Sequence, residues 1–264
     1  MYTDFSDVCF VPDTNIIYPC VFLHNATSLP QNEGICKKCF EKLKEDFNVK
    51  VLPENESEFL YFVHGKFHDF LDVIRDVATK ARDRNQDKVA FEKYVWNQIT
   101  ALGRDYGDLV LYWKVNKNFF FDWVSMDNYS AKISSFRLIE STLERYRACV
   151  IGLTVSWNKT NEENCEKIFD VLKQERKRGS FQSDVDDNDL RLIAGCFEYV
   201  DKYLPSDIGL LYLITNDELA HDTVKKAVRL TSITGGTGKI RPGLDSIKPQ
   251  DFLRKLDISR SPAS

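Results

Sequence analysis

Two fully apolar runs of strand length constrain the fold more than any other feature of this 264-residue chain. One covers residues 8–11 and the other covers residues 208–214. A strand that is apolar on both faces is typical of the interior of a parallel sheet, where helices cover each face. The sequence therefore predicts an α/β fold, a three-layer sandwich in which helices lie on both sides of a central, mainly parallel sheet.

Weaker strand patterns occupy residues 49–53 and 230–234. Apolar residues at three- and four-residue steps predict helices over most of the remaining chain. These helices are expected at residues 35–47, 59–81, 87–104, 130–150, 162–178, 187–203, 218–229 and 249–256. Residues 106–125 are aromatic and fit no single pattern. Because no strand pattern appears between about 66 and 178, we expect a single domain, residues 1–264, with a helical insertion over that range.

The first residues and the cysteines indicate a cytoplasmic protein. Residues 1–7 carry two acids and no basic segment, unlike a signal peptide. No stretch approaches the roughly 18 apolar residues of a membrane helix, so no membrane contact is expected. Seven cysteines are an odd number in a chain of this length, which argues against a disulfide framework. A zinc site is one alternative use of Cys20, His24, Cys36 and Cys39.

An acidic residue follows each of the two apolar runs. Asp13 comes after the first run and Asp217 after the second. The carboxyl ends of parallel strands meet at one sheet edge, where ligand sites form. Two neighbouring carboxylates repel each other unless a cation lies between them, and Mg²⁺ or Mn²⁺ prefers such oxygen ligands. The small polar residues that can hold these carboxylates, and that we expect to contact substrate, are Thr14, Asn15, Thr215 and Asn216.

Two further groups of acids precede helices. The first group follows the second predicted strand and consists of Glu54, Glu56 and Glu58. The second opens the helix at 187–203 and consists of Asp184, Asp186, Asp187 and Asp189. A helix N-terminus tolerates negative charge, so capping of the helix is the alternative to metal binding for the second group.

In chain order, four segments resemble the motifs of PIN-domain nucleases. They are Asp13-Thr14-Asn15, Glu58 in the helix after the second strand, the segment from Asn188 to Ala194, and Leu213-Ile214-Thr215-Asn216-Asp217. The resemblance covers about 1–65 and 180–256, and the closing helix at Pro249 is also similar. It implies a PIN-like fold and a metal-dependent ribonuclease, an endonuclease that acts on single-stranded RNA.

The resemblance also implies roles for single residues. Asp13, Glu58, Asp189 and Asp217 match the four acids that hold Mg²⁺ or Mn²⁺ in the family. Accessory ligands would be Asp186, Asp187 and Asp222. Glu54 or Glu56 could replace Glu58, and Thr215 or Asn216 would orient Asp217. Alternative functions are a non-catalytic RNA-binding or scaffold module, a structure-specific DNA nuclease, and the toxin of a toxin–antitoxin pair.

A polyanion needs positive charge, which a chain of net charge −4 offers only locally. A stretch after the second apolar run contains five basic residues and no acid, namely Lys225, Lys226, Arg229, Lys239 and Arg241. These residues would contact phosphates without reading sequence, and a solvated face is the alternative. The same two interpretations apply to the basic run 176–178. Aromatic residues between 119 and 129 would stack bases, pack in a core, or form the contact of a homodimer.

Overall fold

The computed structural model describes residues 8–24, 29–82, 88–102, 106–115, 128–204, 209–230 and 243–260. These residues divide into two compact units. The first unit contains residues 1–20, 29–58 and 150–264, and the second contains residues 21–28 and 59–149. The predicted insertion, 66–178, overlaps the second unit as far as residue 149.

The first unit is built on a four-stranded sheet in which every strand pair is parallel. Its strands are β1 (Val8–Pro12), β2 (Asn48–Val49), β3 (Leu210–Ile214) and β4 (Leu244–Ile247), in the order β2-β1-β3-β4. The two predicted apolar runs are the central strands β1 and β3, which pair from Val8 with Leu210 to Pro12 with Ile214. The α/β class and the parallel sheet are therefore confirmed.

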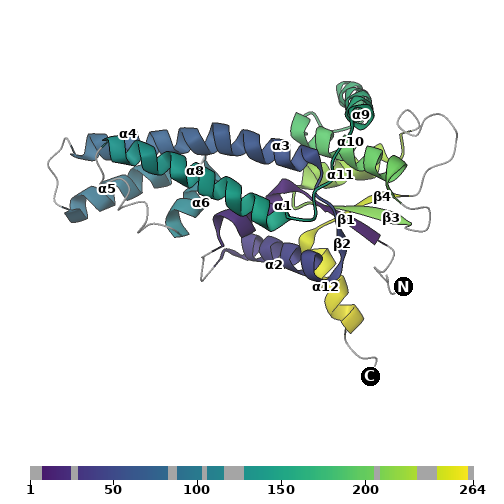
Figure 1. The fold of residues 1–264 in the computed structure, drawn as a ribbon, viewed down its shortest axis with the longest axis horizontal. Coiled ribbons are helices and arrows are strands. Elements are labelled where there is room, and N and C mark those ends of the chain that lie inside the picture. The colour runs from purple at the N-terminus through teal and green to yellow at the C-terminus, as the bar shows by residue number, and fades with distance from the viewer. Residues whose placement is uncertain are drawn as a thin grey trace. The chain divides into compact units, whose positions relative to one another are not determined.

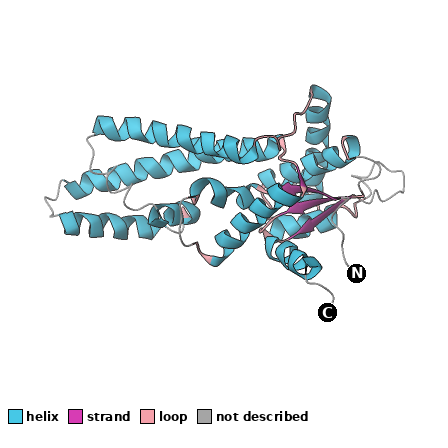
Figure 2. Cartoon of the chain, turned by 60° about the horizontal axis from the view of Figure 1, so that its bottom comes forward, coloured by secondary structure: helices cyan, strands magenta, loops and turns pink. Residues whose placement is uncertain are grey.

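Helices cover both faces of this sheet (Figures 1 and 2). On one face, Cys9 and Val11 belong to a buried cluster with Leu190 of α10 (Asp187–Lys202). Residues of α9 (Lys159–Lys177) and α11 (Glu218–Ala227) belong to the same cluster. On the other face, the ring of Phe10 packs edge-on against Phe252 of α12 (Pro249–Arg260). Because successive side chains of a strand alternate between faces, each apolar run is buried on both sides.

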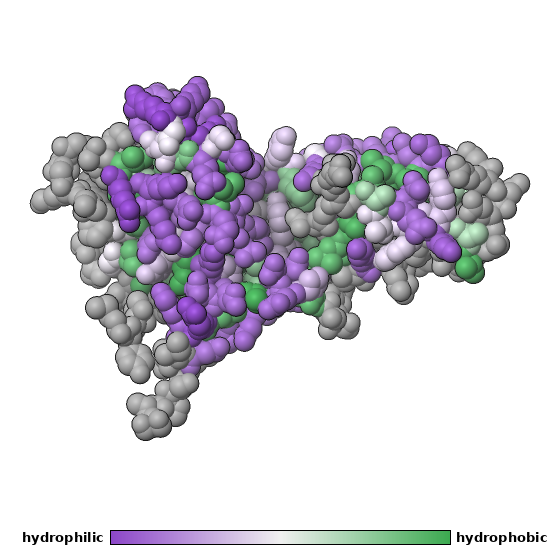
Figure 3. Space-filling model, turned by 180° about the vertical axis from the view of Figure 1, so that it is seen from behind, coloured by the Kyte–Doolittle hydropathy of each residue, from purple (hydrophilic) through white to green (hydrophobic). Residues whose placement is uncertain are grey.

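The helix α9 packs along α10 in the first unit. One side of it is buried through Cys165, Phe169 and Leu172. Its outer surface is strongly hydrophilic, as the top of the first unit in Figure 3 shows. This helix lies within the range predicted as insertion, but it contributes to the layer that covers the sheet.

Three other helices of the first unit begin or end near the strands. They are α1 (Thr14–Phe22), which starts directly after β1, α2 (Gln31–Asp46) and α3 (Pro53–Phe62). Proline occupies the first helical position of α3, where no intrahelical N–H bond is lost. The boundary between the two units falls within α1 and within α3.

The second unit consists of helices in its described part. A short π-helix, Val63–Phe67, continues into α4 (His68–Arg82), and α5 (Lys88–Ala101), α6 (Gly107–Val115) and α8 (Asn128–Val150) follow. Its core is aromatic, with Phe59 stacked on Tyr146 at 4.0 Å between ring centroids. The predicted helices of this region are confirmed, whereas the aromatic segment 119–127 lies outside the described residues.

Several strand predictions differ from the structure. The strand predicted at 49–53 is shorter, because Pro53 already begins α3. The strand predicted at 230–234 lies outside the described residues except for Leu230, which is irregular. The strand β4 was not predicted. Within the described residues, no helix has both the length and the apolar character needed to cross a lipid bilayer.

Candidate functional site

Asp13 lies at the carboxyl end of β1 and is 4% exposed. Its backbone N–H donates to the carbonyl of Ile214 at 2.8 Å, which joins it to the end of β3. Its Oδ2 accepts hydrogen bonds from Asn15 Nδ2 and from Thr215 Oγ1, both at 2.6 Å. Burial raises the pKa of the Asp13 carboxyl to about 6 against the lowering effect of the bond from Thr215 and of the backbone N–H groups of Thr14 and Asn15, and the charge of Asp217 adds to the rise.

Thr215 connects Asp13 with Asp217. Its hydroxyl donates to Asp13 and accepts the backbone N–H of Asp217 at 2.9 Å. Asp217 in turn caps α11, because its Oδ1 accepts the N–H groups of Leu219 and Ala220 at 2.6 and 3.1 Å. Two strand ends and the start of one helix are thus held around a single buried hydroxyl.

Glu58 of α3 lies beside this pair. Its Oε2 accepts the hydroxyl of Thr14 at 2.5 Å, and Thr14 is fully buried. Burial is the main cause that raises the pKa of Glu58 to about 7, and the charges of Asp13 and Asp186 raise it further. The structure therefore brings Glu58 together with Asp13.

The two other glutamates of α3 lie elsewhere. Glu54 accepts the indole N–H of Trp157 at 3.0 Å and lies against Gly195 of α10. Glu56 is exposed. Of the three sequence candidates, Glu58 is the one that the structure places beside Asp13.

Asn55 holds the segment that carries Glu58, a role that the sequence did not reveal. It is fully buried, and its Nδ2 donates to the carbonyl of Pro12 at 3.0 Å and to Thr14 Oγ1 at 3.4 Å. Its Oδ1 accepts the N–H of Leu52 at 2.9 Å. Asn55 thus fastens the end of β1 to the start of α3.

Two aspartates of α10 belong to the same group of acids. Asp186 is the N-cap, since its Oδ1 accepts the N–H groups of Asn188 and Asp189 at 2.7 and 2.9 Å. The capping alternative is therefore confirmed for Asp186. Asp189 has a pKa raised to about 8, first by burial and then by the charges of four carboxylates. In decreasing order of effect, these belong to Asp186, Asp13, Asp217 and Glu58.

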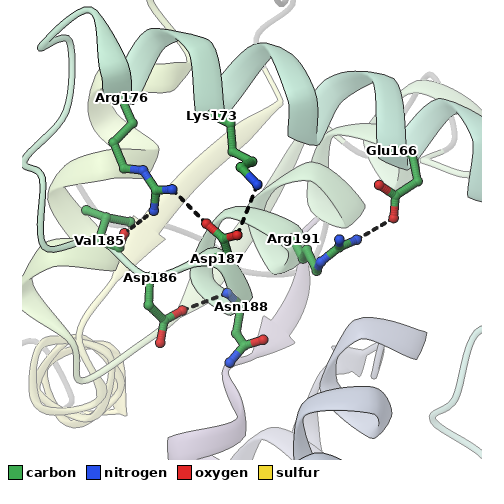
Figure 4. A network of polar contacts seen from close by, with 8 residues as sticks. All are labelled: Glu166, Lys173, Arg176, Val185, Asp186, Asp187, Asn188 and Arg191. Atoms are coloured by element: carbon green, nitrogen blue, oxygen red, sulfur yellow. Dashed lines mark hydrogen bonds and ion pairs between the residues drawn. The ribbon is translucent and has the colours of Figure 1, made fainter.

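Asp187 points toward Arg176 and Lys173 of α9 (Figure 4). Its carboxylate pairs with Arg176 at 2.7 Å and with Lys173 at 3.2 Å. The bond from Arg176 is the main cause that lowers the pKa of Asp187. Arg176 also donates to the carbonyl of Val185. Through these contacts, Asp187 and Arg176 hold the loop before α10 in place. The sequence predicted Asp187 as an accessory metal ligand and Arg176, in the basic run 176–178, as a phosphate contact or part of a solvated face.

The remaining predicted residues belong to α11 or follow it in the sequence. Asp222 follows Asp217 by five residues, which places it on another side of α11 at about 100° per residue. Lys225, Lys226 and Arg229 are exposed at and after the last turn of α11. Lys239 and Arg241 lie outside the described residues.

The acids of this group have the chemistry of a site for a hard cation. Carboxylate oxygens are the preferred ligands of Mg²⁺ and Mn²⁺, and raised pKa values indicate that a positive charge would be favourable here. In their present positions, no three His, Cys, Asp or Glu side chains of the described chain are arranged to hold an ion. That finding applies equally to the zinc alternative at Cys36 and Cys39, which are buried in α2.

Comparisons with known proteins add no family to this description. No family model matches the chain, and no curated protein and no solved structure is significantly similar to it.

Proposed function

We propose that this chain is a metal-dependent nuclease that hydrolyses phosphodiester bonds of RNA. One observation carries the proposal: four elements contribute acids to one partly buried group that has no basic partner among the described residues. The charge of Asp13 raises the pKa of Glu58 and of Asp189, and the charges of Asp217 and Glu58 also raise the pKa of Asp189. No ion pair to them or to Asp217 occurs in the described chain, whereas Asp187, Glu175 and Glu218 each pair with a lysine or arginine.

The order of the motifs also supports the proposal. The acids that resemble the four PIN motifs come from positions 13, 58, 189 and 217, and the charges of Asp13, Glu58 and Asp217 all act on Asp189. We therefore keep the resemblance as the basis for the substrate class, RNA, and for the metal, Mg²⁺ or Mn²⁺.

The protein's own residues would perform three tasks. Asp13, Glu58, Asp189 and Asp217 would hold the metal, whose chemistry is to lower the pKa of a bound water and to neutralise phosphate charge. Thr215 orients the carboxylate of Asp13, and Thr14 orients that of Glu58. Because both hydroxyls are buried, their expected role is positioning of the acids rather than contact with substrate.

The test is cleavage of single-stranded RNA in Mn²⁺ or Mg²⁺, compared between the parent chain and Asp13→Asn. We expect the variant to lose cleavage, since the amide supplies neither the charge nor the second ligand oxygen. Asp170→Asn is the matched control, because Asp170 lies on the exposed side of α9. Equal cleavage by the parent and by Asp13→Asn would refute the assignment of the activity to this site.

Two further measurements separate the alternatives. Single-stranded DNA of the same length tests a DNA nuclease, which would cleave DNA in preference to RNA. Calorimetric titration with Mn²⁺ tests a non-catalytic module, which would bind RNA without binding the metal at these acids. Folding of each variant is compared by circular dichroism, so that a loss of cleavage is not a loss of structure.

A further inference from the structure

Lys248 lies at the same edge of the sheet as the group of acids. It directly follows β4, whose last residue, Ile247, pairs with Ile214 of β3. The backbone N–H of Thr215 donates to the carbonyl of Ile247 at 3.3 Å, so the chain that leads to Asp217 is bonded to the residue before Lys248. Lys248 is not among the residues predicted from the sequence, because the sequence pattern does not predict β4.

The ammonium of Lys248 forms an ion pair with Glu218. Glu218 is the first residue of α11 and follows Asp217 directly. The side chain of Lys248 is 32% exposed and that of Glu218 is 70% exposed. An exposed ion pair of this kind contributes at most about 1 kcal/mol, so an incoming anion can replace Glu218 at little cost.

His221 of α11 lies within electrostatic reach of both Lys248 and Lys225. His221 is 9% exposed, and its Nδ1 has no hydrogen-bond partner within the described part of the chain. Ser246 of β4 donates to the carbonyl of His221 at 3.1 Å, which fixes this turn of the helix against the strand. Burial and the charges of Lys225 and Lys248 together lower the pKa of His221, against the opposite effect of Asp222 and Glu218.

We propose that Lys248, together with Lys225 of α11, binds a backbone phosphate of the nucleic acid strand whose cleavage is assigned to the neighbouring acids. This inference rests on the proposed function and adds the direction in which the strand leaves the acids, past the end of β4 and along α11. A lysine is a compact point charge that contacts phosphate without reading a base. The site therefore accepts the phosphodiester backbone and shows no sequence preference of its own.

The proposal predicts opposite effects for the two members of the ion pair. Lys248→Gln removes the phosphate contact, whereas Glu218→Gln removes the group that competes with phosphate for the ammonium. The matched controls are Lys159→Gln and Glu163→Gln, which make the same charge changes in an exposed lysine–glutamate pair of α9, 4.0 Å apart. The probes are fluorescent oligouridylate and oligothymidylate, and the readout is anisotropy across a salt series in EDTA, where metal-dependent hydrolysis does not occur.

We expect Lys248→Gln to weaken binding of both oligonucleotides several-fold and to reduce the salt slope by about 0.7, the value for one phosphate contact on a single strand. We expect Glu218→Gln to strengthen binding more than Glu163→Gln does. Equal effects of Lys248→Gln and Lys159→Gln, or an effect on oligouridylate alone, would overturn the proposal. Cleavage in Mn²⁺ is measured separately, so a parent chain that binds through Lys248 but does not cleave would refute only the nuclease function.

Discussion

Replacement of Asp189 by asparagine is expected to stabilise the metal-free protein at alkaline pH. The Asp189 carboxyl has a pKa of about 8 in the folded chain, against an ordinary value of 3.8. Asparagine has nearly the same shape as the protonated acid and cannot ionise. The variant therefore removes the like-charge repulsion and the burial of a charge, while it leaves the N-cap bond from Asp189 N–H to Asp186 in place.

The pH dependence follows from the direction of this pKa change. In the unfolded chain the carboxyl ionises near pH 4, whereas in the folded chain it stays protonated up to about pH 8. The parent therefore loses stability between these pH values, and the loss is complete above the folded pKa. At pH 4 both chains carry a neutral group at position 189, so their stabilities should be nearly equal there.

The magnitude follows from the same difference in pKa. A pKa that is higher by about four in the folded chain corresponds to a loss of unfolding free energy of roughly 5–6 kcal/mol as an upper limit. The neighbouring acids share this penalty, and the side chain is partly exposed, so we expect a gain of about 3 kcal/mol at pH 8.5. For a chain of this length that is a rise in Tm of roughly 6–12 °C.

The assay is thermal unfolding in EDTA at pH 4 and at pH 8.5, with Asp170→Asn as the control that should leave Tm unchanged at both. Saturating Mn²⁺ should raise the Tm of the parent more than that of Asp189→Asn, because the variant has lost one carboxylate ligand. A variant that is no more stable than the parent at pH 8.5, or that is equally stabilised at pH 4, would show that Asp189 is not crowded by the other acids.

Two further predictions concern the buried contacts around the acids. Thr14→Val should lower the free energy of unfolding by about 1–3 kcal/mol and weaken Mn²⁺ binding in calorimetry, because Glu58 and Asn55 lose a hydroxyl partner. Thr14→Ser keeps the hydroxyl and should retain both the stability and the Mn²⁺ binding. Equal behaviour of the two variants would contradict the role of the hydroxyl. Gly195→Ala should destabilise the chain by about 1–3 kcal/mol in urea unfolding, since the new methyl carbon would lie 2.7 Å from Oε2 of Glu54. The shorter acid in Glu54→Asp should restore part of that loss, and an absence of any loss in Gly195→Ala would contradict the close packing of α3 on α10.

The strand ends could be predicted because their signals are local. The burial of β1 and β3 on both faces requires continuous apolar residues, and Asp13 and Asp217 come where those runs stop. The strand β4 gives no such signal, since Leu244 and Ile247 are separated by Asp245 and Ser246. Only its pairing with β3 identifies it as a strand. Lys248 was missed for the same reason.

The choice among neighbouring acids depends on contacts that local sequence does not encode. Glu54 and Glu58 are one helical turn apart, so helix periodicity places both on one side of α3. Glu54 meets Trp157, 103 residues away, and Glu58 meets Thr14, 44 residues away. In the same way, Asp187 is drawn to α9 by Arg176 and Lys173, which leaves Asp189 with the other acids.

The way in which the acids are held explains why the repulsion between them persists. The polar groups that contact Asp13, Glu58 and Asp217 are hydroxyls, an amide and backbone N–H groups, all of them neutral. A lysine or arginine in the same places would orient the carboxylates equally well and would also neutralise them, as Arg176 does for Asp187. Neutral donors fix the geometry but leave the repulsion that raises the pKa of Asp189. The repulsion lowers the stability of the fold, but it leaves a group of acids that a divalent cation can neutralise. The proposed nuclease requires such a group.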